Sequence, residues 1–393
     1  MNKVICDNDI CTGCGVCYNV CPVKCITMEY DEEGFLFPIV NEERCIKCNK
    51  CKEGCPSLNE LTNKNYEKPI AIGCWNKNQN IIEKSSSGGA FAAIAEEILK
   101  ENGVVVGCVM DEDLNVYHTI ANNEKELEMM HGSKYLQSET RSVYVDIKGL
   151  LDGGKKVLFT GCPCQVAGLY NYLDGESYNN LITVDLICHG VGSKKFFDMY
   201  IYEMNKKYKE KVTKISFRSK KNGWRKYTTK ISFITRSDIY ISAIKDLYMS
   251  CYLQRAIYRK SCYQCKYSRL PRIADITIGD FIGIDRKQID KKSYQKGVSV
   301  VLLNNKKAES YFENIKTKLN WVARPLQEAV LSNDNINKTS IMPECRKNIL
   351  KDNGSAKQLR DKYCKYKFRV HVANFFGEDI VIFLKKVVRW LKT

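Results

Sequence analysis

The chain lacks long hydrophobic runs and a recognisable leader. No stretch of its 393 residues reaches the roughly 18 consecutive apolar residues that a membrane-spanning helix needs. The first residues, MNKVICDNDICTG, contain no apolar segment of the kind found in secretory signal peptides. We therefore expect a cytoplasmic protein, long enough to hold two or three domains with complete hydrophobic cores.

The sequence also lacks the patterns of two further classes of protein. No Ser-His-Asp set and no paired carboxylates stand out, and we interpret Asp275 and Asp280 in ADITIGDF as residues that orient a strand. The formal net charge of +17 would fit a nucleic-acid-binding protein. However, Lys and Arg are spread along the chain, and no module combines basic with aromatic residues. We expect no nucleic-acid partner, and the positive excess fits acidic partners, anionic cofactors or a membrane surface.

Cysteine, by contrast, is abundant, with 20 residues in the chain. In a chain without an export signal, this number favours metal or redox chemistry over disulfides. The frame Cys-x2-Cys-x2-Cys-x3-Cys-Pro occurs twice, and a loop of this kind can wrap three thiolates around three irons of a cubane cluster. A pair of zinc knuckles is the alternative, although zinc sites usually place two ligand pairs apart in sequence. The two frames consist of Cys11, Cys14, Cys17, Cys21 and Pro22, and of Cys45, Cys48, Cys51, Cys55 and Pro56.

In two-cluster ferredoxins the fourth cysteine of each frame ligates the other cluster. We therefore assign Cys11, Cys14, Cys17 and Cys55 to one [4Fe–4S] cluster. The second [4Fe–4S] cluster takes Cys45, Cys48, Cys51 and Cys21. Between the frames, ITMEYDEEGFLFPIV alternates apolar and polar residues around Glu33-Gly34, which predicts a β-hairpin. Residues 1–60 are thus expected to form a bacterial-ferredoxin-like domain.

The rest of the chain predicts an α+β protein with a mixed α/β domain over residues 70–330. Residues 57–69 are polar and are expected to form a linker. Apolar strand patterns then alternate with helical patterns, followed by a hairpin around Asn222-Gly223. The expected strands are Ile70–Trp75, Val104–Met110, Val157–Thr160, Leu181–Ile187, Lys214–Arg218, Thr228–Ile234 and Val298–Leu303. The expected helices are a segment ending before Gly103, Gln165–Leu173, Lys194–Lys209, Ile244–Tyr258 and Ala308–Leu319.

Residues 331–393 are expected to form a basic C-terminal extension with an amphipathic helix at Glu378–Lys392. Such a helix can lie on an anionic membrane surface, which would place the protein at the inner face of the membrane. Packing of this helix on the protein itself or on a partner is the interpretation that we favour.

Four more cysteines, Cys164, Cys188, Cys262 and Cys265, lie in loops or at predicted strand ends. Two occur in GCPCQ and ICHG, and the other two form the ligand-like pair CYQC. From the residues alone, a third cubane, a zinc site and unligated buried thiols all remain open. The other eight cysteines fit small buried residues.

The motifs SSSGGAF, GCPCQVAGL, DLICHGVGS and CYQCKYSRLPRIADITIGDF resemble those of the family of coenzyme F420 hydrogenase/dehydrogenase beta subunits, in the family's order. The resemblance covers roughly residues 70 to 330. It implies coupling of iron–sulfur clusters to a flavin, normally FAD. It also implies a third [4Fe–4S] cluster on Cys164, Cys188, Cys262 and Cys265, with Cys162 as a competing ligand. His189 would then be a neighbour that tunes the cluster potential.

The resemblance also implies where FAD would bind. We assign Ser86, Ser87, Gly88 and Gly89 to the FAD phosphates, with Ser87 capping the following helix and glycine amides approaching the anion. In GSKYLQS, Lys134 is expected to neutralise phosphate or the flavin ring, and Tyr135 to stack on it. Gln137 and Ser138 complete the expected contacts. Without the resemblance, a capped helix and a solvated loop are the plainer interpretations.

Together these features predict an iron–sulfur flavoprotein oxidoreductase of an oxygen-poor cell. Electrons would move between the clusters and FAD to reduce or oxidise an organic substrate, such as coenzyme F420 or a surface-polysaccharide precursor. A carrier protein such as ferredoxin would be the electron donor or acceptor. The alternative is a non-catalytic electron-transfer subunit that relays electrons to a partner enzyme.

Overall fold

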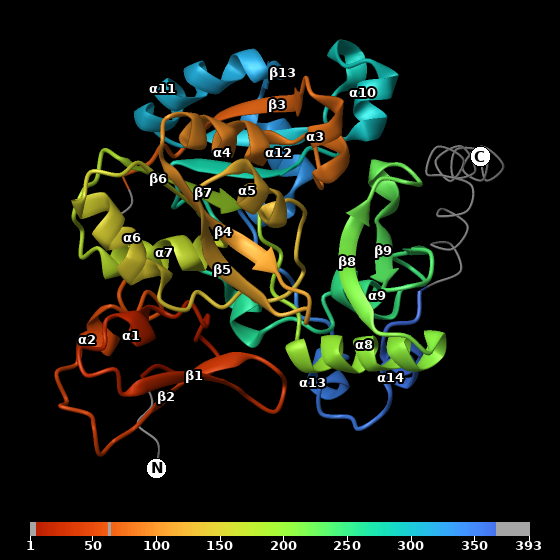
Figure 1. Cartoon of the computed structure of the whole chain (residues 1–393), viewed down its shortest axis with the longest axis horizontal. Coiled ribbons are helices and arrows are strands. Elements are labelled where there is room, and N and C mark those ends of the chain that lie inside the picture. Colours follow the sequence, from red (N-terminus) through yellow and green to blue (C-terminus); the bar gives the residue numbers. More distant parts are fainter. Residues whose placement is uncertain (1–4, 62–63, 367–393) are drawn as a thin grey trace, which may run out of the picture.

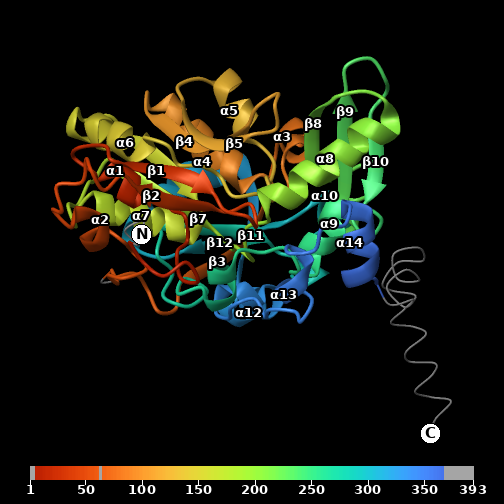
Figure 2. The ribbon, with the colours of Figure 1, turned by 90° about the horizontal axis from the view of Figure 1, so that it is seen from below.

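The computed structural model describes residues 5–61 and 64–366 (Figure 1). The helix expected at Glu378–Lys392 lies outside these residues. Within them, no helix is both long and apolar enough to cross a membrane. The described chain forms a small N-terminal module, a large mixed sheet, and a three-stranded sheet to one side of the large sheet, as both views show (Figures 1 and 2).

The N-terminal module contains two short helices and the predicted hairpin. Strands β1 (Ile26–Tyr30) and β2 (Leu36–Val40) pair antiparallel, which confirms the hairpin. Its turn is closed by Asp31, whose carboxylate accepts hydrogen bonds from the amides of Glu33 and Phe35. Gly34 takes a φ of 83°, a conformation that suits glycine. Helices α1 (Val16–Asn19) and α2 (Lys50–Glu53) each lie within one cysteine frame.

The large sheet has eight strands in the described chain, in the order β13-β3-β12-β11-β7-β6-β4-β5. Strands β4, β6, β7 and β11 run parallel, whereas β5, β12, β3 and β13 extend the sheet antiparallel. The carboxyl ends of the four parallel strands therefore share one edge. The bounds are β3 (Ile70–Asn76), β4 (Val104–Met110), β5 (Val116–Ala121), β6 (Val157–Gly161), β7 (Leu181–Leu186), β11 (Ile276–Asp280), β12 (Ser299–Leu303) and β13 (Leu319–Arg324).

Helices cover both faces of this sheet. Val105 and Val109 of β4 pack in a cluster with α4 and α11, while Val104 and Val106 pack with α6 and α7, as expected for side chains that alternate along a strand. All four valines are buried, which explains the continuous apolar pattern of this strand. The helices around the sheet are α3 (Gln79–Lys84), α4 (Ala90–Lys100), α5 (Glu124–Met130), α6 (Val143–Asp152), α7 (Pro163–Tyr172), α10 (Lys291–Lys296), α11 (Lys306–Ile315) and α12 (Leu326–Ser332).

The second sheet and its helices form a separate core of buried aromatic and aliphatic residues. Strands β8 (Val212–Ser219), β9 (Thr228–Phe233) and β10 (Ile239–Ser242) are antiparallel. Helices α8 (Lys194–Tyr208), α9 (Leu247–Leu253) and α14 (Ala356–Tyr363) pack on one another and on this sheet, and α13 (Arg346–Ile349) lies nearby. The helix predicted for Ile244–Tyr258 was too long, because the chain turns after Leu253 and Arg255 takes a φ of 63°.

The segment predicted to be a linker is in fact packed against the main domain. Asn65 donates hydrogen bonds from its side-chain nitrogen to the carbonyls of Arg272 and Ala274. Tyr66 donates to Glu309 at 2.6 Å. A polar composition favours a flexible linker, but here the polar groups satisfy the backbone of a neighbouring loop.

Candidate metal centres and cofactor site

The structure brings together the four cysteines assigned to the first cluster, here called the inner set (Cys11, Cys14, Cys17 and Cys55). Burial raises the pKa of Cys17, and the thiols of Cys14, Cys11 and Cys55 raise it further, so these sulfurs face one another. Burial likewise raises the pKa of Cys14 to about 12. Cys55 reaches this set from the other frame, which is the crossing that the sequence predicts.

The remaining four cysteines of the two frames, here the outer set (Cys21, Cys45, Cys48 and Cys51), line one pocket. Its empty volume is about 350 Å³, and its other walls include Ile26 and Val40 of the hairpin. A fifth cysteine, Cys25, also lines this pocket, and thiols around one cavity with largely apolar walls fit a [4Fe–4S] cluster, which thiolates hold. Among the described residues, no three His, Cys, Asp or Glu side chains converge on a single metal ion. A cubane differs from such a site because each thiolate binds its own iron, and the sulfurs stand apart.

The third set (Cys164, Cys188, Cys262 and Cys265) is assembled by the sheet. Strands β6 and β7 are parallel neighbours, with Gly161 opposite Asp185, so Cys164 in the first turn of α7 and Cys188 in the loop after β7 lie at the same edge. The segment that holds Cys262 is fixed beside this edge by a bridge between Gly192 and Tyr258. Burial raises the pKa of Cys164, and the thiols of Cys188, Cys265, Cys14 and Cys262 raise it further. These four predicted ligands therefore lie together, and the inner set adjoins them.

An additional thiol contacts each of the three sets. The sulfur of Cys25 lies 3.5 Å from that of Cys21, and the sulfur of Cys162 lies 3.8 Å from that of Cys188. Cys6 is hydrogen-bonded to Cys11 and Cys55. The hydrogen bond from Cys6 and, against the effect of burial, the charge of Arg259 lower the pKa of Cys11 to about 6.

Close packing joins the inner set to the third set. Gly168 lies four residues after Cys164, on the same face of α7, and a Cβ atom there would stand 3.4 Å from Cys14 Sγ. The hydroxyl of Tyr144 lies 2.9 Å from the carbonyl oxygens of both Cys14 and Gln165 and shares its one proton between them. Only glycine lets the module approach α7 this closely.

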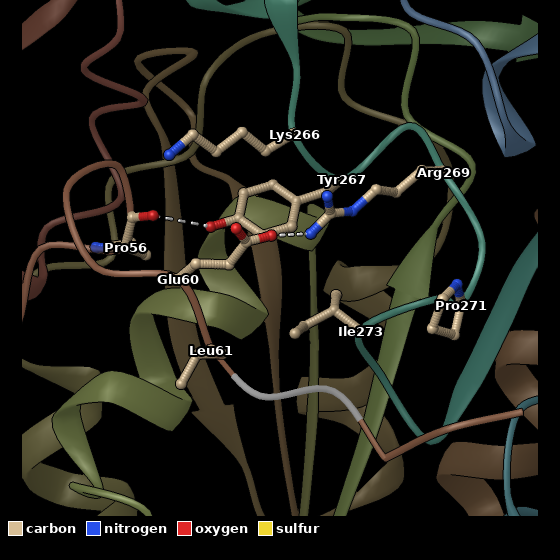
Figure 3. A pocket seen from close by; sticks show the side chains of 8 residues that line it. All are labelled: Pro56, Glu60, Leu61, Lys266, Tyr267, Arg269, Pro271 and Ile273. Atoms are coloured by element: carbon tan, nitrogen blue, oxygen red, sulfur yellow. Dashed lines mark hydrogen bonds and ion pairs between the residues drawn. The ribbon is translucent and has the colours of Figure 1, made fainter. Parts of the chain in front are cut away.

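Tyr267 lies between the inner set and the third set, and it also lines a surface pocket (Figure 3). Burial and then the thiols of Cys164 and Cys14 raise its pKa. The pocket has an empty volume of about 380 Å³, and Figure 3 shows the Tyr267 ring between Lys266 and the ion pair of Arg269 with Glu60. The protein thus covers the junction between the two sets with an aromatic ring.

Part of the segment assigned to flavin binding instead holds the N-terminal module. Gln137 donates to the carbonyls of Thr12 and Gly13 and accepts from Arg259. Ser138 is buried, and its hydroxyl lies 2.7 Å from the ring nitrogen Nδ1 of His118. Both side chains have their polar atoms satisfied by protein groups, so the prediction that they contact FAD is not supported by this geometry.

The other segments assigned to FAD do meet, but several of their groups already have partners. Ser86 accepts hydrogen bonds from the amide and the hydroxyl of Ser133. Gly88 donates its amide to Ser299, and Ser87 donates to the carbonyl of Val298. The prediction that Ser87 caps α4 was wrong, because Gly89 occupies that position without a side-chain cap. Gly88 is needed instead for packing, since a Cβ there would lie 2.4 Å from the Cys74 carbonyl oxygen.

Lys134 and Tyr135 also have roles within the protein. The Lys134 ammonium donates to the carbonyls of Met129, Met130 and His131 at the end of α5, so its three protons are used. The Lys134 ammonium, which we expected to neutralise phosphate or the flavin ring, is therefore already bound by protein carbonyls. The ring of Tyr135 packs edge-on against Tyr252, and its hydroxyl accepts a hydrogen bond from Arg218.

The structure reveals donors beside the Ser85–Gly89 turn that the sequence interpretation missed. Arg218 pairs with Asp280 at 2.7 Å, but its second terminal nitrogen is buried and has no hydrogen-bond partner among the described residues. The ring nitrogen of Trp224 is likewise buried and has no hydrogen-bond partner among the described residues. Lys220 donates to the carbonyls of Ile82 and Ser87, and burial lowers its pKa to about 7. These residues belong to the segment FRSKKNGWRK. Its basic residues could have indicated an anion-binding site, but from the sequence we predicted only a hairpin there.

The unpaired donors provide a test of the expected flavin. Phosphates and the ring carbonyls of a flavin are hydrogen-bond acceptors. Buried donors without partners, next to a cationic guanidinium, suit acceptors that are not part of the chain. The residues around Ser85–Gly89 therefore fit an anionic, acceptor-rich group.

Three family models match the chain. A 4Fe-4S dicluster domain matches residues 10–59. The N-terminal and C-terminal models of the coenzyme F420 hydrogenase/dehydrogenase beta subunit match residues 71–144 and 154–329.

Three proteins similar to this chain come from species of Methanocaldococcus and Methanosarcina. An uncharacterized protein of Methanocaldococcus jannaschii is 23% identical, over 80% of this chain and 88% of its own length. A subunit of the F420H2 dehydrogenase of Methanosarcina mazei is 20% identical, over 81% and 86% of the two chains. A chain of the F420-reducing [NiFe] hydrogenase complex from Methanosarcina barkeri is 15% identical, covering 72% of this chain and 92% of that one, with a TM-score of 0.48. With its three matching models in order along the sequence, this chain belongs to the family of coenzyme F420 hydrogenase/dehydrogenase beta subunits and carries an N-terminal 4Fe-4S dicluster domain.

Proposed function

We propose that the protein is an iron–sulfur flavoprotein oxidoreductase with three [4Fe–4S] clusters and FAD, acting on an organic substrate of the deazaflavin class. The observation that carries this proposal is the continuity of the three cysteine sets. The outer and inner sets share the small core of the N-terminal module, and the inner set adjoins the third set across Gly168. The third set lies at the edge of the sheet where the parallel strands end.

The residues would divide the work as follows. When bound, cubanes supply one-electron transfer and a flavin supplies the conversion between single electrons and a hydride. The inner, outer and third cysteine sets would hold the clusters. Arg218 and Lys220, next to the Ser85–Gly89 turn, would bind the FAD phosphates. Burial of the inner set and the cover that Tyr267 provides would exclude water and oxygen from the path of the electrons between the clusters.

The deazaflavin substrate is supported by the family and by the name of one relative, which is part of an F420H2 dehydrogenase. A surface-polysaccharide precursor is the second substrate class to assay. The name of that relative also describes it as a subunit, which makes a protein partner for this chain plausible.

One observation favours a second function, that of a relay subunit without flavin. The polar groups of Gly88, Lys134 and Gln137 are all occupied by protein partners, which leaves the expected flavin contacts filled. In that case the three clusters alone would pass electrons to a partner enzyme.

Cofactor analysis after anaerobic purification separates the two functions. The flavoenzyme should contain about 12 irons, since each of three cubanes holds four, and about one FAD per chain. Iron and sulfide without flavin would support the relay. The reduced protein mixed with coenzyme F420 should bleach the absorbance of the oxidised deazaflavin. A flavin-containing protein that leaves it unchanged would exclude this substrate.

A further inference from the structure

The two cysteine frames have the same spacing but opposite surroundings. The first frame, from Cys11 to Cys21, is here called the inner frame. The residues between its first three cysteines carry no charge: Thr12, Gly13, Gly15 and Val16. The carbonyls of Thr12 and Gly13 are bound by Gln137 of the main domain. The inner frame is thus committed to a contact inside the protein.

The second frame begins with CIKCNKCK, residues 45–52, a segment that faces solvent. Between Cys45 and Lys52 it carries three lysines, Lys47, Lys50 and Lys52, and no acidic residue. Lys24 follows the fourth cysteine of this set, Cys21. All four lysines are exposed, and none forms an ion pair within the described residues. The acids nearest in sequence, Glu42, Glu43 and Glu53, flank this segment rather than interrupt it.

An apolar side chain and an exposed cysteine lie within this basic segment. Ile46 is 60% exposed. Of the cysteines in the described chain, Cys48 is the exposed one. Helix α2, which carries Lys50 and Lys52, lies at the edge of the molecule in both views, away from the three-stranded sheet (Figures 1 and 2).

We propose that this surface, formed by Lys24, Ile46, Lys47, Lys50 and Lys52 around Cys48, is the docking site of an acidic one-electron carrier protein of the ferredoxin type. This docking site rests on the proposed function in one respect only, namely that the outer set holds a cluster. Electron transfer falls steeply with distance, so a carrier has to dock where the cofactor approaches the surface. Unpaired lysines there attract a carrier whose own cofactor is surrounded by carboxylates. A small apolar centre within a charged rim is typical of a weak, transient electron-transfer contact.

The test is the rate at which a reduced, acidic two-cluster ferredoxin reduces the protein's clusters, followed by anaerobic stopped-flow absorbance. The variant Lys47→Glu/Lys50→Glu should react about tenfold more slowly at low ionic strength, and the difference should shrink at high salt because screening removes the steering. The variant Lys24→Glu/Lys52→Glu should behave alike, which guards against a local effect on one loop. The control Lys291→Glu/Lys292→Glu makes the same charge change on α10, at the far side of the molecule, and should change the rate less than twofold.

Iron and sulfide content are measured for every variant, so that a lost cluster is not mistaken for lost docking. If both charge-reversal variants keep full iron content and react at the original rate with the original salt dependence, the proposal is overturned. An equal slowing in the control would also overturn it, since net charge rather than this surface would be responsible. The measurement stops at the clusters, so failure to find FAD or a substrate would refute the proposed function without affecting this result.

Discussion

At the scale of single residues, the sulfur contacts distinguish ligands from their neighbours. Cys162 and Cys188 lie with their sulfurs 3.8 Å apart, in contact, whereas the thiolates of a cubane bind separate irons. If Cys188 binds iron, Cys162 does not, and Cys164 is the cysteine of GCPCQ that serves as the ligand. We therefore expect Cys164→Ser to lose about four irons per chain, those of one cubane, and Cys162→Ser to keep them.

Iron and sulfide analysis of the anaerobically purified variants measures this directly. Cys25→Ser serves as a matched control, because Cys25 also contacts a predicted ligand, at 3.5 Å, and should keep its full iron content. Loss of iron in Cys162→Ser with retention in Cys164→Ser would reverse the assignment.

Lys220 gives a second prediction, on pH. Burial lowers its pKa to about 7, and the nearby charge of Arg218 adds to the effect, whereas an unfolded chain keeps this proton to about pH 10.4. Since the unfolded state binds more protons between these values, Lys220 makes the folded state more stable as the pH rises through this window. A bound phosphate would favour the charged form, so FAD affinity should fall as the pH rises above about 7.

The measurement is the FAD dissociation constant, from flavin fluorescence, over about pH 6 to pH 9, which spans this titration. Lys220→Met should weaken binding about tenfold or more, as expected for a lost charged hydrogen bond, and should flatten the pH dependence. The exposed Lys221→Met, one residue along, should change neither. An unaltered pH profile in Lys220→Met would show that this lysine does not meet the flavin.

At the scale of elements, the close contact of α7 with the N-terminal module depends on Gly168. A Cβ atom there would stand 2.9 Å from the Tyr144 hydroxyl and 3.3 Å from Cys14 Cβ. Gly168→Ala should therefore lower the free energy of unfolding by about 1–3 kcal/mol, as overpacking does, despite the better helix propensity of alanine. Gly149→Ala in α6 is the matched control: no atom lies within 4 Å of the added Cβ, and stability should rise by about 0.5–1 kcal/mol.

Denaturant unfolding under anaerobic conditions compares these two variants with the original chain. If the outer set and the third set both hold clusters, Gly168→Ala should also slow the passage of electrons from the outer set to the third set. If both alanine variants are equally stable, the module does not press on α7 as the distances indicate.

The elements also show what sequence patterns can and cannot predict. Strands such as Val104–Met110 and the hairpin around Gly34 follow from local periodicity and turn residues, and they were found at nearly their true bounds. Strand β13 was missed, because Leu319–Arg324 gains its place only by pairing with β3, far away in sequence. The contacts made by GSKYLQS could not be predicted for the same reason. Nothing local to GSKYLQS indicates that Gln137 binds a loop more than a hundred residues earlier.

At the scale of the whole molecule, the N-terminal module is attached by specific polar contacts as well as by buried residues that pack into the clusters of the main domain. Arg346 pairs with Glu33 at 2.6 Å and donates to the carbonyl of Tyr258 at 2.7 Å. Arg259 is buried and donates to the carbonyl of Cys11 at 2.6 Å. These contacts hold the inner set beside the third set.

The core of the module predicts how the molecule responds to loss of iron. Three of the six buried residues in the module's own cluster are cysteines (Cys17, Cys25 and Cys55), and the others are Ile5, Ile26 and Val40. So small an apolar core stabilises a module of this size only together with metal–thiolate bonds. After anaerobic removal of iron by a chelator, amide hydrogen exchange should rise strongly over residues 5–61 and in the segment around Cys262. It should stay slow in β4, β6 and β7, whose valines and leucines form their own core. Exchange that rises equally in the module and in these strands would show instead that the whole chain unfolds as one unit and that the clusters support the sheet as well.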